Sequence, residues 1–341
     1  MSVEFGFGLI TCQRYPGDER TGVELYAEAI DLAVEAERLG FDSVWTSEHH
    51  FVDDGYLPSV LPLSAAIAAR TERITIGTGL LLAPLHEPIR VAEDAAVVDL
   101  ISGGRVILGL GIGWRVEEFE GLHVPMSERG ARLEDAVEVY RRAWRGELVT
   151  GGRRARYPNV PVRPLPARPA GPPIWIGGSE EPALRRAGRL GDGFMASESR
   201  APTLAEQAQI VRDARAAAGG DPTFTISVHL PTFAWSDGDA WDRVRDYSWY
   251  VEWKYDDMDQ ARSRVGPPEP PPPPTPEQEE SLRHVMLLGR PDAVVDQIAQ
   301  LRDAVGGDLH YIARLYWPGM DAGLQREAMT VFAEEVIPKL R

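Results

Sequence analysis

Two spacings of apolar residues alternate along the chain. Short apolar runs of strand length are separated by segments whose apolar residues recur at helical spacing, such as 21–39, which Gly40 follows as a C-cap. The pattern predicts strands at 3–10, 41–45, 73–82, 105–110, 174–177, 193–196, 223–232 and 308–315. It predicts helices at about 21–39, 58–70, 88–101, 117–146, 182–190, 203–218, 240–257, 291–305 and 323–340.

This alternation is typical of βαβ units and a parallel sheet. Eight strands with helices between them predict an α/β fold, an eightfold (β/α) TIM barrel over 1–341 as a single domain, with insertions between the late strands. We expect 148–173, rich in Gly, Arg and Pro, to be a hairpin and an extended excursion. The proline-rich loop 256–282 contains the run from Pro267 to Pro276, which favours extended backbone. We predict that it is a lid over the barrel mouth; a surface linker is the alternative.

The strand at 41–45 leads directly into Trp45-Thr46-Ser47-Glu48-His49-His50-Phe51. In a barrel the carboxyl ends of the strands open onto one cavity, and catalytic groups collect there. Because side chains alternate along an extended chain, His49 and His50 should point to opposite sides, one to the cavity and one to its supporting shell. We predict a catalytic role for His49. The alternative is a pair of half-exposed loop histidines.

Two glycine-rich stretches also end predicted strands. Gly109-Leu110-Gly111-Ile112-Gly113 precedes a helix, but Trp114 stands where a dinucleotide fingerprint needs glycine, so a Rossmann site is excluded. Because every second residue of this stretch is glycine and has no side chain, a flat ligand could approach the backbone. Gly177-Gly178-Ser179 opens a helix, where N–H groups and a hydroxyl suit an anion. Together they predict a flat cofactor with a phosphate; a tight turn and a plain serine N-cap are the alternatives.

Composition narrows the class of protein. The 341 residues include 36 Lys and Arg and 52 Asp and Glu. The resulting net charge of -16 argues against nucleic-acid or anionic-membrane partners. The single cysteine, Cys12, excludes an intrachain disulfide and a thiolate metal cluster. No apolar run reaches the length of a membrane span, so we expect a soluble cytoplasmic protein. We expect no metal, because Glu48, His49 and His86 have no metal-ligand spacing, and a hydrolase has no G-x-S-x-G elbow.

Several of these motifs, in this order, resemble the bacterial luciferase-like family of flavin- and F420-dependent oxidoreductases over essentially the whole chain. The resembling stretches are 40–45 with 48–51, Ile76-Gly77-Thr78-Gly79, Arg90 with Ala92-Glu93-Asp94, Ser102-Gly103-Gly104-Arg105, 109–113 and 174–179. The resemblance implies an eightfold barrel with a large insertion near the last strands and, commonly, a homodimer.

The resemblance also assigns roles to single residues. His49 matches the histidine near the reactive carbon of the flavin, where an imidazole can move a proton at neutral pH. Gly79-Leu80 matches a bulge with a non-prolyl cis peptide against which the flavin ring rests. The chain departs from the luciferase pattern at two positions that match contacts with the flavin phosphate. Ile112 stands in place of an arginine, and Gly178, next to Ser179, stands in place of a glutamate. The expected cofactor contacts are Phe7, Thr78, Gly79, Leu80, Gly111, Ile112, Gly177, Gly178 and Ser179.

The function that follows is an FMN-dependent monooxygenase that uses reduced flavin and O₂ on a small organic substrate, apolar or aromatic. We expect the substrate pocket to include His50, Tyr56, Trp114 and Trp317. Reduced flavin would come from a separate NAD(P)H-dependent flavin reductase. One alternative is an F420-dependent hydride-transfer oxidoreductase, although Trp114 and Asp53 replace the acid and the tryptophan of the F420-dependent sugar-phosphate dehydrogenases. A second is a non-catalytic flavin-binding barrel.

Overall fold

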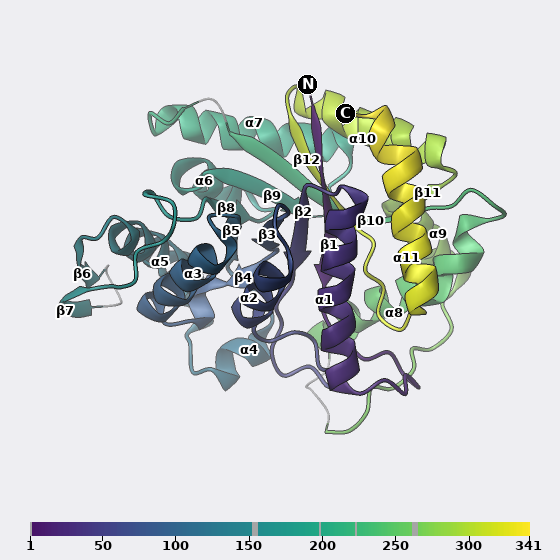
Figure 1. Cartoon of the computed structure of the whole chain (residues 1–341), viewed down its shortest axis with the longest axis horizontal. Coiled ribbons are helices and arrows are strands. Elements are labelled where there is room, and N and C mark those ends of the chain that lie inside the picture. Colours follow the sequence, from purple (N-terminus) through teal and green to yellow (C-terminus); the bar gives the residue numbers. More distant parts are fainter. Residues whose placement is uncertain (1, 152–155, 198, 222–223, 261–264) are drawn as a thin grey trace.

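Eight parallel strands close into a barrel in the computed structural model, which describes residues 2–151, 156–197, 199–221, 224–260 and 265–341. Each strand pairs with the next around the ring, and β1 closes it by pairing with β12, with Val3 opposite Leu309 (Figure 1). The predicted (β/α) barrel is therefore confirmed. The barrel strands are β1 (Val3–Ile10), β2 (Ser43–Thr46), β3 (Thr75–Thr78), β5 (Val106–Gly111), β8 (Ile174–Gly177), β9 (Gly193–Ser197), β10 (Thr225–Ala234) and β12 (Leu309–Arg314), and the short β4 (Leu81–Leu82) pairs with β5.

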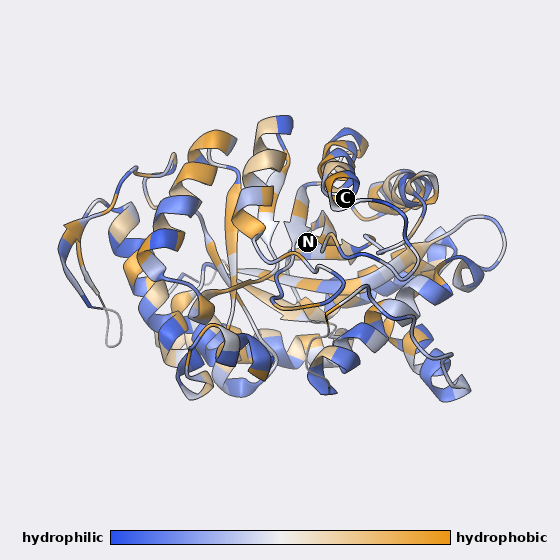
Figure 2. Ribbon diagram, turned by 90° about the horizontal axis from the view of Figure 1, so that it is seen from below, coloured by the Kyte–Doolittle hydropathy of each residue, from blue (hydrophilic) through white to orange (hydrophobic). Residues whose placement is uncertain are grey.

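Amphipathic helices surround the barrel because each buries one apolar stripe against the strands. Figure 2 shows hydrophobic residues on the strands and inner helix faces, with hydrophilic residues outside. The first helix begins at a capping box between Thr21 and Glu24 and ends at Gly40, whose φ of 86° suits glycine. The surrounding helices are α1 (Gly22–Leu39), α2 (Val60–Arg70), α3 (Pro88–Ser102), α5 (Arg129–Trp144), α6 (Glu181–Leu190), α7 (Ala201–Ala217), α10 (Pro291–Val305) and α11 (Ala322–Val331), with a π turn at Phe332–Val336 and a 3₁₀ turn at Ile337–Lys339 after the last.

Tryptophan fills the barrel interior. Trp45 is fully buried and stacks on Trp175 with ring centroids 5.2 Å apart. Glycines make room for it: a Cβ added to Gly77 would lie 2.2 Å from the Trp45 ring. The cavities lie at the carboxyl ends of the strands, and α4 (Val116–Gly121) and α8 (Ala240–Gln260) lie at this end of the barrel, in the lower part of Figure 1.

The two predicted insertions turn out differently. As predicted, 148–173 contains a hairpin, in which β6 (Leu148–Gly151) pairs antiparallel with β7 (Arg156–Pro161). The predicted loop 256–282 is shorter, because α8 extends to Gln260 and α9 (Pro276–Val285) begins at a capping box between Thr275 and Gln278. Proline is tolerated in the first turn of a helix, so Pro276 starts this one. A further strand, β11 (Leu287–Gly289), pairs with the end of β10 and was not predicted.

Smaller differences concern helix limits and membranes. The predicted helix at 117–146 is divided into α4 and α5, with a 3₁₀ turn at Met126–Glu128 between them. A 3₁₀ turn at Ala83–Leu85 likewise precedes α3. Within the described ranges, no helix combines the length and the apolar character that crossing a bilayer requires.

Candidate active site

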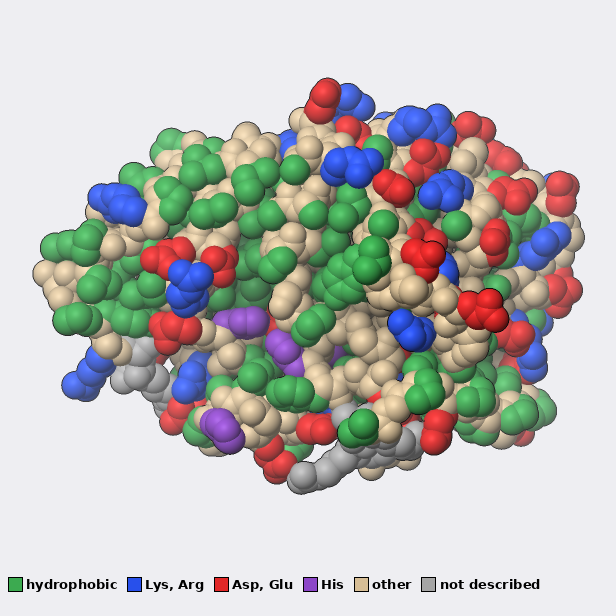
Figure 3. Space-filling view, turned by 60° about the horizontal axis from the view of Figure 1, so that its bottom comes forward, with side chains coloured by type: hydrophobic (Ala, Val, Ile, Leu, Met, Phe, Trp, Pro, Cys, Tyr) green, Lys and Arg blue, Asp and Glu red, His purple; other side chains and the backbone are tan. Residues whose placement is uncertain are grey.

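Two cavities open at the carboxyl ends of the strands, where Figure 3 shows histidine side chains gathered in a hollow. The first, about 370 Å³ and called here the glycine-lined cavity, is bounded by residues after β2, β3, β5 and β8. The second, about 320 Å³, is the helix-lined cavity, bounded by α8, α9 and the last strands. Both cavities are in the size range of small-molecule sites. They share Leu9, Trp114, Ser197, His229 and Tyr255.

His49 lines the glycine-lined cavity and is held by a buried carboxylate. Its Nδ1 lies 2.8 Å from Oε1 of Glu118, a side chain of α4 with no exposed surface. The same oxygen accepts a hydrogen bond of 2.9 Å from the backbone N–H of His50. Because a carboxylate can only accept, Nδ1 donates, and Nε2 is the ring atom left to exchange a proton.

Three aromatic rings enclose the His49 imidazole. The ring centroids of Tyr56, Trp114 and Tyr255 lie 4.8, 5.6 and 5.7 Å from it. The Tyr56 hydroxyl donates to Ser47 and lies 2.9 Å from the Tyr255 hydroxyl. Burial raises the pKa of Tyr56, so its hydroxyl stays protonated. Tyr56, expected in the substrate pocket, is thus a buried support for His49, whereas Trp114 lines both cavities as expected.

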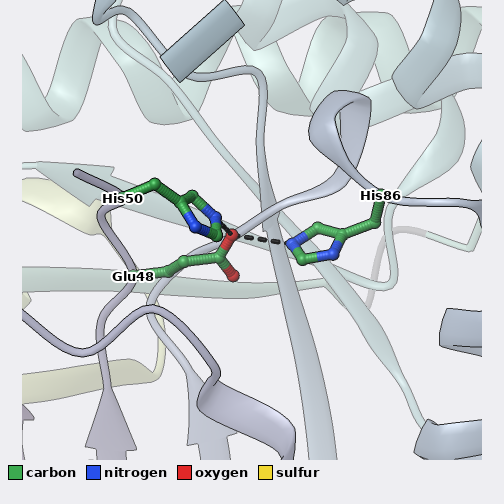
Figure 4. A group of neighbouring side chains, drawn as sticks. All are labelled: Glu48, His50 and His86. Atoms are coloured by element: carbon green, nitrogen blue, oxygen red, sulfur yellow. Dashed lines mark hydrogen bonds and ion pairs between the residues drawn. The ribbon is translucent and has the colours of Figure 1, made fainter. Parts of the chain in front are cut away.

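His50 lines neither cavity, and its imidazole points toward Glu48 (Figure 4). Its Nε2 lies 2.9 Å from Glu48 Oε1, and Nε2 of His86 lies 2.7 Å from the same oxygen. Burial acts to raise the pKa of Glu48, but the two imidazoles outweigh it and hold that pKa below its usual value. Burial acts to lower the pKa of His86, and Glu48 raises it overall. His50, expected in the substrate pocket, thus lies beside the cavities in contact with Glu48.

The glycine-rich strand ends meet where the sequence predicted. Gly79, Leu80, Gly111, Ile112, Gly177, Gly178 and Ser179 all line one cavity. The Gly79–Leu80 peptide is cis, as the family resemblance implied. The glycines accommodate a side chain as well as open space, because a Cβ on Gly177 would lie 2.4 Å from Leu80 Cδ1 and one on Gly111 would lie 3.0 Å from it. The absence of side chains at Gly111 and Gly177 therefore allows Leu80 to pack against the strand ends.

A cationic side chain lines this cavity near Gly177-Gly178-Ser179, where the sequence predicted an anion site. Arg129, at the start of α5, lines it together with Ser179 and Glu180. Within the described part of the chain, Arg129 forms no ion pair and remains partly exposed. The cavity is thus lined by an arginine from α5, whereas Ile112 stands where the family resemblance would place an arginine.

Two expected cofactor contacts lie elsewhere. Phe7 has no exposed surface and packs outward against Phe41, with ring centroids 6.0 Å apart. The residue of β1 that lines the cavities is Leu9, two positions later and close to the open end of the barrel. Thr78 is buried, and its hydroxyl donates to the carbonyl of Gly109 at 2.7 Å, which joins neighbouring strands. Neither side chain lines the glycine-lined cavity, because each is committed to the packing of the barrel.

The helix-lined cavity has an apolar wall. Val251 of α8, Leu282 and Val285 of α9, and Trp317, an expected substrate contact, all line it. Its polar contribution includes His229 and Arg314. Burial and the nearby Arg314 lower the pKa of His229 to about 3, so this imidazole is neutral at physiological pH.

Sequence reasoning missed the partners of His49 and the far wall of the site. Glu118, Tyr255 and His229 are far from 45–51 in sequence, and the sequence did not indicate that they border the same site. Arg129 lies in the middle of the helix predicted at 117–146, and only the structure shows that it stands at the start of α5.

A model of the luciferase-like monooxygenase family matches residues 5–308. The chain therefore belongs to the luciferase-like monooxygenase family. The F420-dependent glucose-6-phosphate dehydrogenase of Nakamurella multipartita is 39% identical over 52% of this chain and 54% of its own length, so the chain spans about half of that relative. The corresponding enzyme of Kineococcus radiotolerans is 30% identical over 91% of this chain and 92% of its own. The oxygenase component of a flavin-dependent trigonelline monooxygenase from Acinetobacter baylyi is 31% identical over 50% of this chain and 48% of its own.

Two solved monooxygenase structures superpose on this chain over nearly its whole length. The monooxygenase RslO1 from Streptomyces bottropensis superposes with a TM-score of 0.84 at 27% identity, over 98% of this chain and 99% of that one. The oxygenating constituent of 3,6-diketocamphane monooxygenase from Pseudomonas putida, solved with FMN, superposes with a TM-score of 0.78 over 100% of this chain and 99% of that one. At 22% identity, the second likeness shows the shared barrel alone.

Proposed function

We propose that this protein is an FMN-dependent monooxygenase that acts with reduced flavin and O₂ on a small apolar or aromatic substrate. The observation that carries the proposal is the His49–Glu118 pair, which borders a cavity lined by Ser179 and Arg129, next to a second cavity with a largely apolar wall. Reduced FMN, when bound, supplies the electrons that activate O₂. A separate NAD(P)H-dependent reductase would supply the reduced flavin, since the sequence has no nicotinamide fingerprint.

The glycine-lined cavity fits such a cofactor by its donor set. Ser179, the N–H groups before α6 and the Arg129 guanidinium are the kinds of donor that bind phosphate. Leu80 and the Gly79 backbone offer an apolar surface to a flat ring. These residues would hold FMN in place and would exclude water from one of its faces.

His49 is the group that would move a proton. Glu118 fixes the orientation and tautomer of the imidazole, as a buried carboxylate does for catalytic histidines in general. Tyr56, Trp114 and Tyr255 keep water from the ring, so the proton passes between Nε2 and a group in the cavity. The neutral His229, at the junction of the two cavities, is available as a hydrogen-bonding group for an uncharged substrate oxygen.

Hydride transfer with F420 is the second candidate, and the relatives named as F420-dependent dehydrogenases favour it. The helix-lined cavity favours the monooxygenase. A sugar phosphate calls for several cations, whereas Arg314 is the one Lys or Arg in the described lining of that cavity, and much of the wall is apolar.

Anaerobic titration of the purified protein with reduced FMN and, separately, with F420 tests the choice of cofactor. We expect tighter binding of reduced FMN, and product formation from apolar aromatic substrates once O₂ is admitted. Tight F420 binding with weak FMN binding would overturn both the cofactor and the oxygen chemistry. Binding of FMN without turnover of any substrate would favour a non-catalytic flavin-binding barrel.

A further inference from the structure

Glu48, His50 and His86 form a cluster separate from the His49–Glu118 pair. Glu48 and His50 follow β2, and His86 follows the 3₁₀ turn Ala83–Leu85. Figure 4 shows the two imidazoles converging on one carboxylate from opposite sides. One ligand atom from each of the three residues lies within 4.8 Å of the others.

The Glu48 carboxylate at the centre of the cluster can accept more bonds than it does. Glu48 has no exposed side-chain surface, and both hydrogen bonds from the imidazoles go to Oε1. Its second oxygen, Oε2, is buried and receives no hydrogen bond from any residue that the structure describes. A buried carboxylate oxygen normally has a partner, so this one marks a place where a further ligand or ion would be stabilised.

We propose that Glu48, His50 and His86 bind one divalent transition-metal ion of the Zn²⁺ type. Two imidazoles and a carboxylate are a donor set that suits Zn²⁺, and three protein ligands leave one position for water. Metal–ligand bonds of about 2.1 Å at tetrahedral angles put ligand atoms roughly 3.4 Å apart. The Oε1–Nε2 separations of 2.9 and 2.7 Å would open by about 0.5 and 0.7 Å, which side-chain rotation supplies.

Binding exchanges one set of bonds for another. Each Nε2 atom now donates a proton in its hydrogen bond to Glu48. On metal binding this proton moves to the other nitrogen of the same ring or to solvent, and the lone pair that is freed binds the metal. The ion then ties the segment after β2 to the segment before α3. Glu48 also lines the glycine-lined cavity, so the metal would brace one of its walls. This proposal does not depend on the identity of the cofactor.

Zn²⁺ titration of chelator-treated protein by calorimetry, without flavin or substrate, tests the proposal. We expect one equivalent per chain, and Co²⁺ in its place should give the visible absorption of a low-symmetry site. His86→Gln and Glu48→Gln should each weaken binding at least about tenfold, the loss that follows even from removing an outer hydrogen-bond partner of a metal site. His284→Gln, an exposed histidine of α9, is the matched control and should bind as the parent does.

Circular dichroism shows which variants fold. If Glu48→Gln fails to fold, His86→Gln carries the test, because the His86 side chain is 28% exposed and is the least buried of the three. Weak binding of several ions, or binding that is equal in His86→Gln and the parent, would overturn the proposal. The cluster would then be a carboxylate shared between two imidazoles by hydrogen bonds alone.

Discussion

Glu118 is expected to act on turnover through His49, and a double-mutant cycle measures the coupling between the two residues. Glu118→Gln keeps the shape but removes the charge that orients Nδ1. We expect His49→Ala to cut turnover by ~10²-fold or more, the usual contribution of a proton-transfer group, while FMN binding stays near normal. Glu118→Gln should cost a similar factor by itself and little more in the His49→Ala background, because the two residues work as a unit. Additive losses in the double variant would separate Glu118 from His49.

Arg129 gives a sharper test of the phosphate end. Arg129→Met should weaken FMN binding by about tenfold or more, the effect of losing a hydrogen bond to a charged group. Riboflavin lacks the phosphate, so its affinity should not change. Arg185→Met, which breaks an exposed ion pair with Glu181 on α6, is the control and should leave both affinities as they are. An equal loss for riboflavin would mean that Arg129 supports the fold of the cavity.

At the scale of elements, α9 owes its start to Thr275. Thr275 accepts from the backbone N–H of Gln278, and the Gln278 side chain accepts in return from the backbone N–H of Thr275. Thr275→Ala should cost about 1 kcal/mol and speed amide exchange in α9 about fivefold, since this surface helix can open locally. Thr21→Ala removes the same motif from α1, which packs on the barrel, and should lower global stability without a local change in α9. Unchanged exchange in α9 would show that its packing, and not the cap, sets its stability.

The proline run before α9 has its own test. Trp249 of α8 donates from Nε1 to the carbonyl of Pro272 at 2.6 Å, so the run is held against the same helix that lines the helix-lined cavity. We predict that deleting Pro267 to Pro274, which preserves the Thr275 cap, will raise the share of reduced FMN that O₂ consumes without product. Such uncoupling is the expected result of losing a lid that excludes water. Coupling equal to that of the parent would identify a linker.

At the scale of the molecule, α3 carries an apolar face that a second copy could cover. Val97, Leu100 and Ile101 share one side of the helix and are 42%, 46% and 47% exposed. Since the sequence resemblance implies a homodimer, we predict that Leu100→Glu shifts the protein to the monomer in light scattering after size exclusion. Val23→Glu changes an isolated residue that is 81% exposed and should leave the assembly unaltered. A parent protein that is monomeric at micromolar concentration would contradict the prediction.

The sequence by itself determined the barrel and the placing of His49 and the glycine-rich strand ends at one open end of it. These follow from periodicity and turn residues, which are properties of short windows, and from the rule that parallel strands bring their carboxyl ends together. The hairpin within 148–173 followed from the same local signals.

The tertiary structure decided which side chains meet. Glu118 reaches His49 across 69 residues, and His86 joins Glu48 across 38. The orientation of Phe7 away from the cavities, and the commitment of Thr78 to Gly109, depend on strand register and on neighbours distant in sequence. A short window contains none of this information, because contacts between loops are fixed only when the whole barrel closes.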